Sequence, residues 1–345
     1  MNSKVSGIIR LVAWSLAALI LTSVLLVNIF DILPDSSKIN AAAGKRANSS
    51  ENKAADTMVS FAKSFDLSTW GSEMNFSGSW GVYKYDYSHK YIIAKDSVNA
   101  SNIGNININW LHGEVSIYEY DGEDIKFYET SSTAADDELK MHYYIEGENL
   151  SIQYCASGTE NNKLNNLTKE LIIQVPHEYN IADISVKTLS SVDVAEISAG
   201  KINMNLVSGN ADFFRVKADT IYVNTVGGKV ISSETKVSSF CTNSVGGKID
   251  IEGNFDSVKC DSVSGKIMVS SGAEVKKINA SSVSGEVVVY LPENIDGFKS
   301  ENESVSGGVE SDFPVIYNKK SMTYGDGSAD FNLNTVSGSI KILKY

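Results

Sequence analysis

The stretch that decides the fold is residues 262–292, which reads SVSGKIMVSSGAEVKKINASSVSGEVVVYLP. It contains the motif Ser-Val-Ser-Gly twice, ending at Gly265 and at Gly285. Apolar and other residues alternate after each glycine and again before each motif, and this period of two with β-branched residues indicates strands. A glycine suits a corner that needs a positive φ or a close approach of two backbones. The unit is therefore two short strands around a tight corner.

The same four-residue motif occurs seven times in the C-terminal half of the chain, with LVSG, TVGG, SVGG and TVSG as variants. Its glycines are Gly209, Gly228, Gly247, Gly265, Gly285, Gly307 and Gly338, at intervals of 19, 19, 18, 20, 22 and 31 residues. One such unit cannot bury its apolar face, whereas stacked units can pair strand on strand. The spacing predicts an all-β fold, a β-solenoid of stacked two-strand coils of about 19 residues. A β-sandwich of hairpins is the alternative.

Stacking also predicts which side chains recur from coil to coil. We expect the corner valines to form an inward stack: Val207, Val226, Val245, Val263, Val283, Val305 and Val336. A second inward stack is expected from Ile221, Phe240, Val258 and Ile278. The corner hydroxyls should form a ladder of Thr225, Ser244, Ser262, Ser282, Ser304 and Thr335.

The three cysteines argue against a disulfide-built fold, because the number is odd and the chain is long. They are Cys155, Cys241 and Cys260. Cys241 stands three residues before its corner serine and Cys260 two residues before its own, so alternation puts them on opposite faces. We predict Cys260 inside, Cys241 outside and no bond between them.

The region before the repeats is also rich in predicted strands, at residues 103–117, 124–129, 150–154 and 171–176. We expect residues 58–180 to form an irregular β-rich region that starts and caps the solenoid, and residues 181–345 to form the repeat domain. Residues 82–87 alternate and read as a strand. The aromatic cluster around them should pack on the solenoid end, with stacking on a glycan as the alternative; it comprises Trp80, Tyr83, Tyr85, Tyr87 and Tyr91.

The N-terminus contains a 20-residue stretch without a charge, residues 11–30, LVAWSLAALILTSVLLVNIF. This length matches the hydrocarbon core of a bilayer. We predict a cytoplasmic tail and transmembrane helix over residues 1–33 and a flexible linker over 34–57; a cleaved signal and a buried soluble helix are the alternatives. Lys4 and Arg10 precede the stretch and favour the cytoplasm for the tail, although Lys38, Lys45 and Arg46 lie beyond it. The bulk of the chain should then be extracytoplasmic.

Three segments together carry a family resemblance: the repeated Ser-Val-Ser-Gly, residues 171–176 (LIIQVP), and residues 322–327 (MTYGDG) leading into 331–342 (FNLNTVSGSIKI). The chain resembles over residues 103–345 the bacterial family called "putative adhesin", a domain of unknown function. The resemblance implies an envelope protein with a β-solenoid ectodomain, an N-terminal anchor and no established catalytic activity. The 31-residue last interval departs from the period, so residues 308–334 should form a loop or a cap.

Composition and motifs argue against nucleic-acid binding, catalysis and metal binding. The 42 acidic and 30 basic residues give a net charge of −12, which disfavours nucleic-acid binding. The standard nucleophile, zinc and phosphate-loop motifs are missing from the sequence. We expect no cofactor and no metal ligand among His89, His112, His142 and His177. Asp326 is expected in a turn rather than on Ca²⁺. The repeat-domain carboxylates Asp212, Asp250, Asp261 and Glu286 should occupy different coil positions and form no catalytic pair.

One row of side chains is a candidate ligand site. Lys229, Lys248 and Lys266 each follow a corner glycine and should stack as a cationic stripe, which Glu286 interrupts in the next coil. A solvated corner is the simpler interpretation. The function that we expect is a membrane-anchored, non-catalytic adhesion, scaffold or interaction module of the cell envelope. Its expected partners are a cell-wall polymer or an envelope protein, with end-to-end self-association as a further option. Envelope-stress signalling and a glycan-active enzyme are the alternatives.

Overall fold

The computed structural model describes residues 82–94, 96–132, 136–164, 167–318 and 320–345. The chain divides into two compact units, 1–78 and 79–345, and the described residues belong to the second. The predicted anchor, the linker and Trp80 lie outside the described residues. Within the described part of the chain, no helix is both long enough and apolar enough to cross a membrane.

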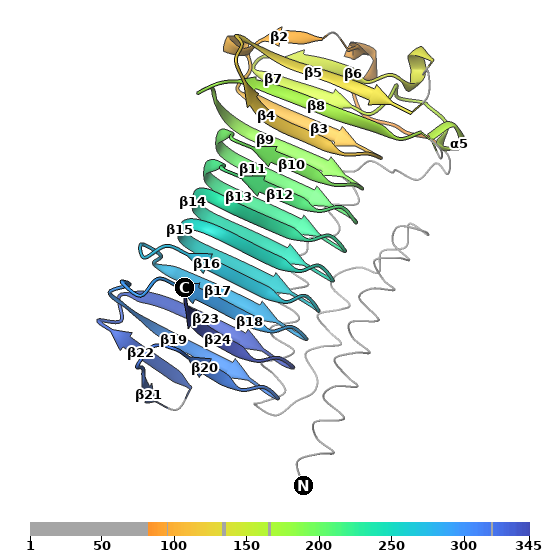
Figure 1. Cartoon of the computed structure of the whole chain (residues 1–345). Coiled ribbons are helices and arrows are strands. Elements are labelled where there is room, and N and C mark those ends of the chain that lie inside the picture. Colours follow the sequence, from red (N-terminus) through yellow and green to blue (C-terminus); the bar gives the residue numbers. More distant parts are fainter. Residues whose placement is uncertain (1–81, 95, 133–135, 165–166, 319) are drawn as a thin grey trace. The chain divides into compact units, whose positions relative to one another are not determined.

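The described strands form a mainly β, largely parallel structure that consists of two ladders of strands (Figure 1). The two ladders face each other across the core. Ladder 1 contains the strands that follow the corners. In spatial order they are β8 (Lys169–Pro176), β4 (Val115–Tyr120), β10 (Val192–Ala195), β12 (Ala211–Phe214), β14 (Val230–Ser244), β15 (Ile249–Ser262), β16 (Ile267–Ser271), β18 (Val287–Leu291), β24 (Ile340–Lys344) and β20 (Val309–Ser311).

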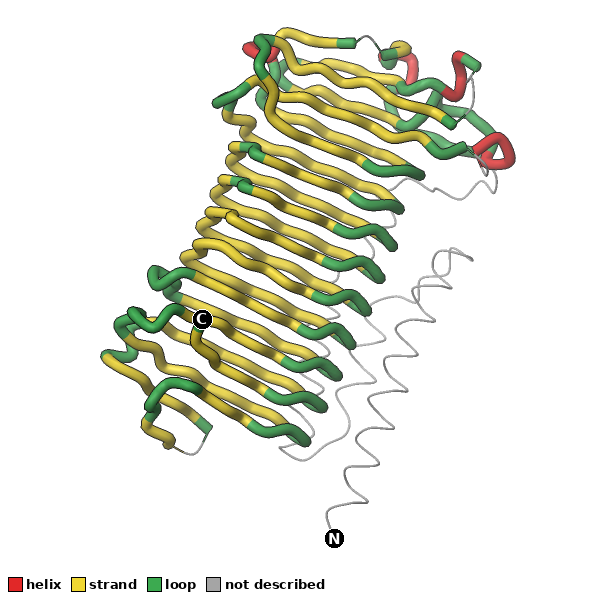
Figure 2. Tube along the Cα trace, in the orientation of Figure 1, coloured by secondary structure: helices red, strands yellow, loops and turns green. Residues whose placement is uncertain are grey.

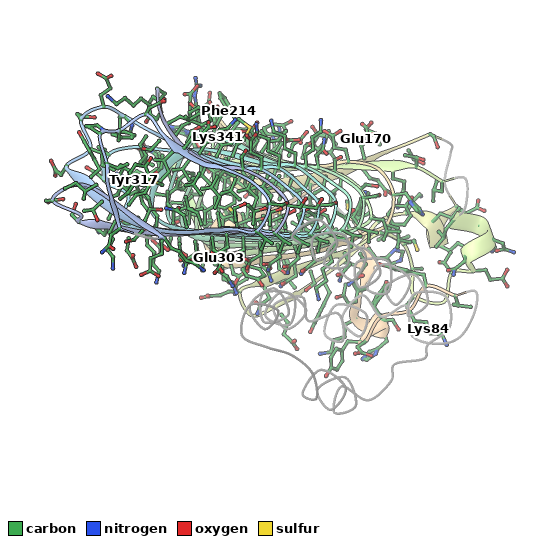
Figure 3. All side chains as sticks on the ribbon, turned by 90° about the horizontal axis from the view of Figure 1, so that it is seen from below. Lys84, Glu170, Phe214, Glu303, Tyr317 and Lys341 are labelled. Carbon is green, nitrogen blue, oxygen red and sulfur yellow. The ribbon has the colours of Figure 1, made fainter. Side chains whose placement is uncertain are left out.

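Ladder 2 contains the strands that lead into the corners. In spatial order they are β7 (Asn149–Gln153), β3 (Asn105–Trp110), β9 (Asn180–Thr188), β11 (Ser198–Leu206), β13 (Lys217–Thr225), β14, β15, β17 (Lys277–Ser282), β23 (Ala329–Thr335) and β19 (Gly297–Ser304). The long strands β14 and β15 serve both ladders. Seen along the stack, the two ladders form opposite sides of a flattened coil, with Phe214 and Lys341 on one side and Glu303 on the other (Figure 3).

The pairing register matches the repeat in the sequence. Leu206 pairs with Thr225 and Thr225 pairs with Ser244, so each residue faces the residue 19 positions later. Neighbouring strands in both ladders are parallel, whereas a sandwich of hairpins would make them antiparallel. The hairpin alternative is therefore wrong, and the described residues form ten stacked levels. One of these levels uses Ser191 where the motif has glycine, and the motif count missed it.

The order of the levels in space differs from their order in the chain. The last coil, β23–β24, lies between β17–β18 and β19–β20. In the same way, β3–β4 lies between β7–β8 and β9–β10. The 31-residue interval is the path that makes the first of these insertions possible, because the chain leaves the terminal level and returns one level inward.

Antiparallel strands extend three of the four ends of the ladders, and Figure 2 shows the strands and loops around both ends of the stack. At the β7–β8 end, β6 pairs with β7 and β5 pairs with β8; at the other end, β22 pairs with β19. The remaining elements are β1 (Ile92–Ile93), β2 (Ser97–Asn99), β5 (Asp124–Ser131), β6 (His142–Glu146), β21 (Ile316–Asn318), β22 (Ser321–Gly325), η1 (Ser88–Lys90), η2 (Ala100–Asn102), η3 (Asp137–Leu139) and α5 (Asn161–Leu164). Within residues 308–334, β21 and β22 form a cap, which was one of the two expectations for this interval, whereas β20 and most of β23 are ladder strands.

The aromatic segment before the ladders packs partly as expected. Tyr83 is buried and donates a hydrogen bond to Gln153 Oε1 at 2.8 Å, beside the end of β7. The rings of Tyr83, Tyr85 and Tyr91 follow one another at centroid distances of 5.7 and 4.7 Å. The predicted strand over 82–87 is wrong, because only Val82 forms a β-bridge and a turn follows at Tyr87. The alternation there reflects aromatic packing rather than a ladder.

Strand alternation places the core between the ladders. The predicted column of Ile221, Phe240, Val258 and Ile278 is fully buried. The predicted inward stack of corner valines is wrong: Val245, Val263 and Val283 are shielded but stand outside the core cluster, and Val305 is 54% exposed. The alternation that buries Ile221 also turns Thr225 inward, so the next residue, the valine, points out of the corner.

The cysteine predictions are confirmed. Cys260 is fully buried, Cys241 is only partly buried, and all three cysteines are free thiols. Cys241 pairs in register with Lys259 rather than with Cys260, which pairs with Thr242. Burial raises the pKa of Cys241 and raises that of Cys155 to about 11, so neither thiol ionises readily.

At each of several corners, a serine hydroxyl forms a hydrogen bond with the backbone of the corner glycine. Ser244, Ser262 and Ser304 each accept a hydrogen bond from the glycine N–H three residues later, at 3.0, 2.8 and 2.8 Å. The inward hydroxyl also reaches the neighbouring level, where Thr335 Oγ1 donates to the carbonyl of Gly285 at 3.0 Å. The hydroxyls therefore satisfy buried backbone groups where the strands turn.

The corner glycines are required by a close approach of backbones, because none of the seven has a positive φ. A Cβ on Gly247 would lie well inside van der Waals contact of the Gly228 carbonyl, and the same holds from level to level. The neighbouring residue Gly246 differs, since its Cβ would lie 3.6 Å from the nearest atom, the Val226 carbonyl oxygen.

These two adjacent glycines give a matched test. We predict that Gly247→Ala lowers the free energy of unfolding by about 3 kcal/mol or more, because the backbones must separate. Gly246→Ala should change it by less than about 0.5 kcal/mol. Urea unfolding of both variants measures the difference, and equal stabilities would contradict the close-packed corner.

Candidate functional site

The predicted lysine row exists, but acidic side chains neutralise most of it. Lys248 forms an ion pair with Asp250 at 2.6 Å, and Lys266 forms one with Glu286 at 2.8 Å. Lys229 is exposed and has no ion-pair partner among the described residues, although its charge acts on Asp212. The row is therefore a set of local pairs along the corner rather than a continuous cationic stripe.

Glu286, which interrupts the row, binds its neighbours on both sides. Besides Lys266 it contacts Lys341 at 2.8 Å and accepts a hydrogen bond from the Ser339 hydroxyl at 2.8 Å. These three donors lower the pKa of Glu286 to about 2. Since Lys341 and Ser339 belong to the inserted last coil, this carboxylate ties that coil to β18.

The lowered pKa has a consequence for acid stability. A carboxylate whose pKa falls on folding stabilises the fold above its unfolded pKa of about 4.3, and this contribution is lost as the pH falls towards 2. We predict that Glu286→Gln destabilises the protein by about 1 kcal/mol at pH 7. The difference from the wild type should shrink between pH 5 and pH 2 in urea unfolding. A stability difference between the variant and the wild type that stays constant over this pH range would show that the ionised Glu286 carboxylate does not stabilise the fold.

The other predicted candidates do not form a reactive group. Asp212 and Asp250 fall in one outward column of ladder 1, two levels apart with Ile231 between them, so the expectation that they occupy different coil positions is wrong. Asp261 lies on ladder 2 and pairs with Lys259 at 3.3 Å. Asp326 accepts from the backbone N–H of Ser328 at 2.9 Å, as a turn residue does.

The described histidines do not build a metal site with the acidic side chains around them. His177 contacts Glu119 at 2.6 Å, and His89 lies in η1. Among the described residues, no group of three or more histidine, cysteine or acidic side chains is arranged to hold a metal ion. The sequence analysis missed an acidic pair, Asp193 and Asp212, which lie side by side in the same column. Asp193 also forms a hydrogen bond with Glu114 and so raises the pKa of Glu114.

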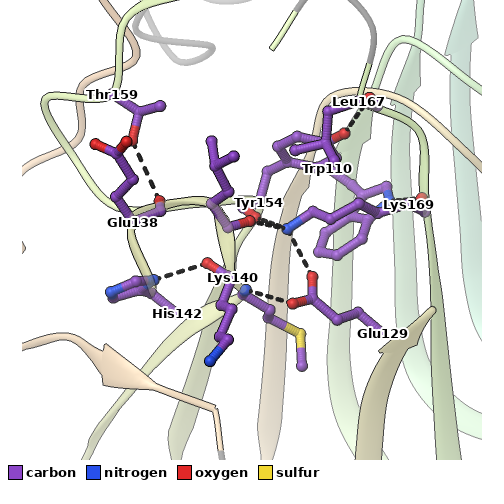
Figure 4. A network of polar contacts seen from close by, with 11 residues as sticks. Trp110, Glu129, Glu138, Lys140, His142, Tyr154, Thr159, Leu167 and Lys169 are labelled. Carbon is purple, nitrogen blue, oxygen red and sulfur yellow. Dashed lines mark hydrogen bonds and ion pairs between the residues drawn. The ribbon is translucent and has the colours of Figure 1, made fainter. Parts of the chain in front are cut away.

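A buried lysine at the β7–β8 end forms a network that the sequence analysis also missed (Figure 4). Lys169 begins β8, and its side chain is 0% exposed. Its ammonium forms an ion pair with Glu129 at 2.6 Å, donates to the Leu139 carbonyl at 2.7 Å and donates to the Tyr154 carbonyl. It also lies 4.3 Å from the ring centroid of Tyr154 and 5.1 Å from that of Trp110.

Lys169 stabilises the fold through this network and does not present a reactive amine. Burial lowers the pKa of Lys169, and Glu129 opposes that change. A lysine in such surroundings can serve as a nucleophile when a substrate reaches it. Here its ammonium donates two hydrogen bonds to backbone carbonyls and forms an ion pair with Glu129, and its side chain is sealed from solvent. The ring nitrogen of Trp110 also binds the Lys169 carbonyl at 2.9 Å, which fixes β3 to β8.

Removing one partner of this pair should be costly. We predict that Lys169→Ala lowers the free energy of unfolding by about 3 kcal/mol, since Glu129 is left buried without its counter-charge. The double variant Lys169→Met with Glu129→Gln should recover at least half of that loss. Urea unfolding of the two variants tests this, and a double variant less stable than Lys169→Ala would count against it.

A concavity lies on ladder 2, at the start of its strands, and we call it the axial groove. Its volume is about 540 Å³. It is lined by Asn180, Ser198, Ala199, Lys217, Ala218, Asp219, Lys236, Val237, Ser238, Asn254, Phe255, Asp256, Gly272 and Glu274. These residues come from successive levels, so the groove runs across the strands and along the stack.

The register explains the hollow. Ile181, Ala199, Ala218, Val237 and Phe255 are consecutive members of one column. Four of these residues belong to the hydrophobic core, and only Ala218 is partly exposed. The column therefore forms a mostly buried floor, and the exposed side chains on either side of it, such as Lys217 and Asp219, form the polar walls of the axial groove.

The walls of the axial groove carry two lysine charges that form no ion pair with the described residues. Lys217 and Lys236 are exposed neighbours in register, and neither has an ion-pair partner among the described residues. Nearby lysines outside the lining are paired, such as Lys201 with Asp183 at 3.8 Å and Lys276 with Asp256 at 3.2 Å. Sequence reasoning missed this pair because it searched beside the motif, yet the interval of 19 residues was visible.

Solved structures with similar backbones come from bacteria. A "putative adhesin" from Bacteroides fragilis is 16% identical, with 74% of this chain and 97% of that chain covered and a TM-score of 0.41. A "putative cell adhesion protein" from Clostridium sporogenes is 17% identical, with 74% and 99% covered and a TM-score of 0.28. A "putative lipid binding protein" from Parabacteroides distasonis is 16% identical, with 74% and 96% covered and a TM-score of 0.39.

The search of curated proteins gave no match. A family model, described as Toastrack DUF4097, matches residues 103–343. This match covers both ladders from β3 to β24 and agrees with the family resemblance of the sequence. The chain belongs to the Toastrack DUF4097 family, a domain family of unknown function.

Proposed function

We propose that the chain is a non-catalytic binding module of the bacterial cell envelope, which serves in adhesion or as a scaffold. The axial groove is the observation that carries this proposal. It is a long concavity lined by side chains from successive levels, and it suits an extended partner better than a small substrate.

The chemistry of the described residues supports a binding role over a catalytic one. Catalysis by acid and base needs two titratable groups held on either side of one reacting bond. In the axial groove, Asp256 is held by Lys276 at 3.2 Å, and the two unpaired lysines lie side by side on one wall. The buried Lys169 is occupied by the structural network.

The N-terminal sequence supports an attachment to the membrane. Residues 11–30 are long and apolar enough to cross a bilayer, and Lys4 and Arg10 favour the cytoplasm for the short tail. We propose that this segment anchors the chain, with residues 34–57 as a linker and the ladders outside the cytoplasm. A cell-wall polymer or an envelope protein would then be within reach.

Protease treatment of intact cells tests the placement. We predict that added protease removes the signal of an antibody against β23–β24 and leaves a membrane-bound stub. Cells opened before treatment are the control for protease activity. Full protection in intact cells would contradict an exposed ectodomain and would direct the search to cytoplasmic partners.

Binding to isolated envelopes tests the role itself. The purified chain should sediment with cell walls from the same bacterium, because a binding module recognises its partner without turnover. A chain that sediments with no envelope fraction, but changes the products of an envelope polymer, would contradict the non-catalytic role.

A further inference from the structure

The shape of the axial groove restricts what can fill it. Its lining runs from Asn180 on β9 to Glu274 after β16, which is six levels and five spacings. At ~4.8 Å per spacing, the groove is roughly 24 Å long, so its volume of about 540 Å³ corresponds to a cross-section of roughly 20 Å². This is room for one extended chain rather than for a compact ligand.

The direction of the groove argues against a peptide strand. A peptide that extends a sheet lies parallel to the strands and pairs with a free backbone edge. The axial groove crosses the strands, and the ladder pairing on both sides of Lys217 and Lys236 already uses the backbone. The ligand must therefore be recognised by side chains.

The floor and walls match one chemical class. Ala218 is the partly exposed residue of the floor and offers a small apolar surface to the C–H side of a sugar ring, between the buried Ala199 and Val237. Asp219 and Ser238 offer hydrogen bonds to hydroxyls along one wall. One sugar unit in an extended chain advances by about one strand spacing, ~5 Å, so successive units would meet equivalent positions in successive levels.

The unpaired lysines give one part of the axial groove a local positive charge, although Asp219 and Glu274 also line it. Two ammonium groups one level apart repel each other, and an anion between or above them removes that cost. We propose that the axial groove binds one strand of a linear, carboxylate-bearing polysaccharide, with its acidic groups at Lys217 and Lys236. This proposal rests on the proposed function as a binding module and names the ligand of its groove.

Oligomannuronates of two, four and six units are suitable probes, with neutral cello-oligosaccharides of equal length for comparison. The full chain in detergent should bind the acidic hexamer more tightly than the acidic dimer, since only the hexamer spans the groove. The neutral hexamer should bind at least tenfold more weakly than the acidic one. Isothermal titration calorimetry measures all of these affinities.

Two double variants separate the groove from general charge. Lys217→Gln with Lys236→Gln should weaken binding of the acidic hexamer at least tenfold. Lys248→Gln with Lys266→Gln removes the same charge outside the groove and should change it less than twofold. Ala218→Leu fills the floor and should also weaken binding, provided that its unfolding midpoint stays that of the wild type.

Three results would overturn the proposal. These are equal losses in the two double variants, equal binding of a polyglycerol phosphate chain that neither variant alters, and no binding of any acidic oligosaccharide by the wild type. The proposed function fails separately. If the wild type and the Lys217→Gln, Lys236→Gln variant sediment equally with cell walls, the chain is a binding module whose site lies elsewhere.

Discussion

Backbone contact between corner glycines of neighbouring levels determines the rest of the architecture. The carbonyl of Gly228 occupies the place where a Cβ of Gly247 would stand, so only glycine lets the two corners approach to strand spacing. This contact fixes the register of both ladders at once. With the register fixed, every residue of one coil lies over its equivalent in the next, and columns of side chains follow automatically.

The fixed register explains both the core and the surface. Inward columns become continuous apolar stacks, and inward hydroxyls satisfy the N–H groups of the corner glycines. Outward columns acquire properties that no single coil possesses. The alternation of Glu196, Arg215 and Glu234 forms one such column, with ion pairs of 3.2 and 2.9 Å. The axial groove is another, formed between the exposed columns on the two sides of Ala218, which include Lys217 and Asp219.

Much of the fold could be predicted because the repeat is encoded locally, in the alternation and in the interval of about 19 residues. The corner valines were misassigned because the hydrophobic character was given more weight than the alternation, which continues through Thr225. The insertion of β23–β24 could not be predicted, since strand order in space is set by pairing across distant segments. The candidate site could also be predicted only in part. The lysine row was visible in the sequence, whereas the ion pair of Lys266 with Glu286 and the Lys169 network join residues far apart in the sequence.

The insertion of β23–β24 has a consequence for the making of the protein. When the ribosome has released β19 and β20, their final neighbours have not yet been synthesised, so the edges of β17 and β18 stay open. The level closes only after β23 and β24 have been synthesised and Glu286 meets Lys341. A chain that lacks these two strands would present unpaired parallel edges, which favour aggregation. Strands made early in synthesis therefore depend on strands made later to cover their edges.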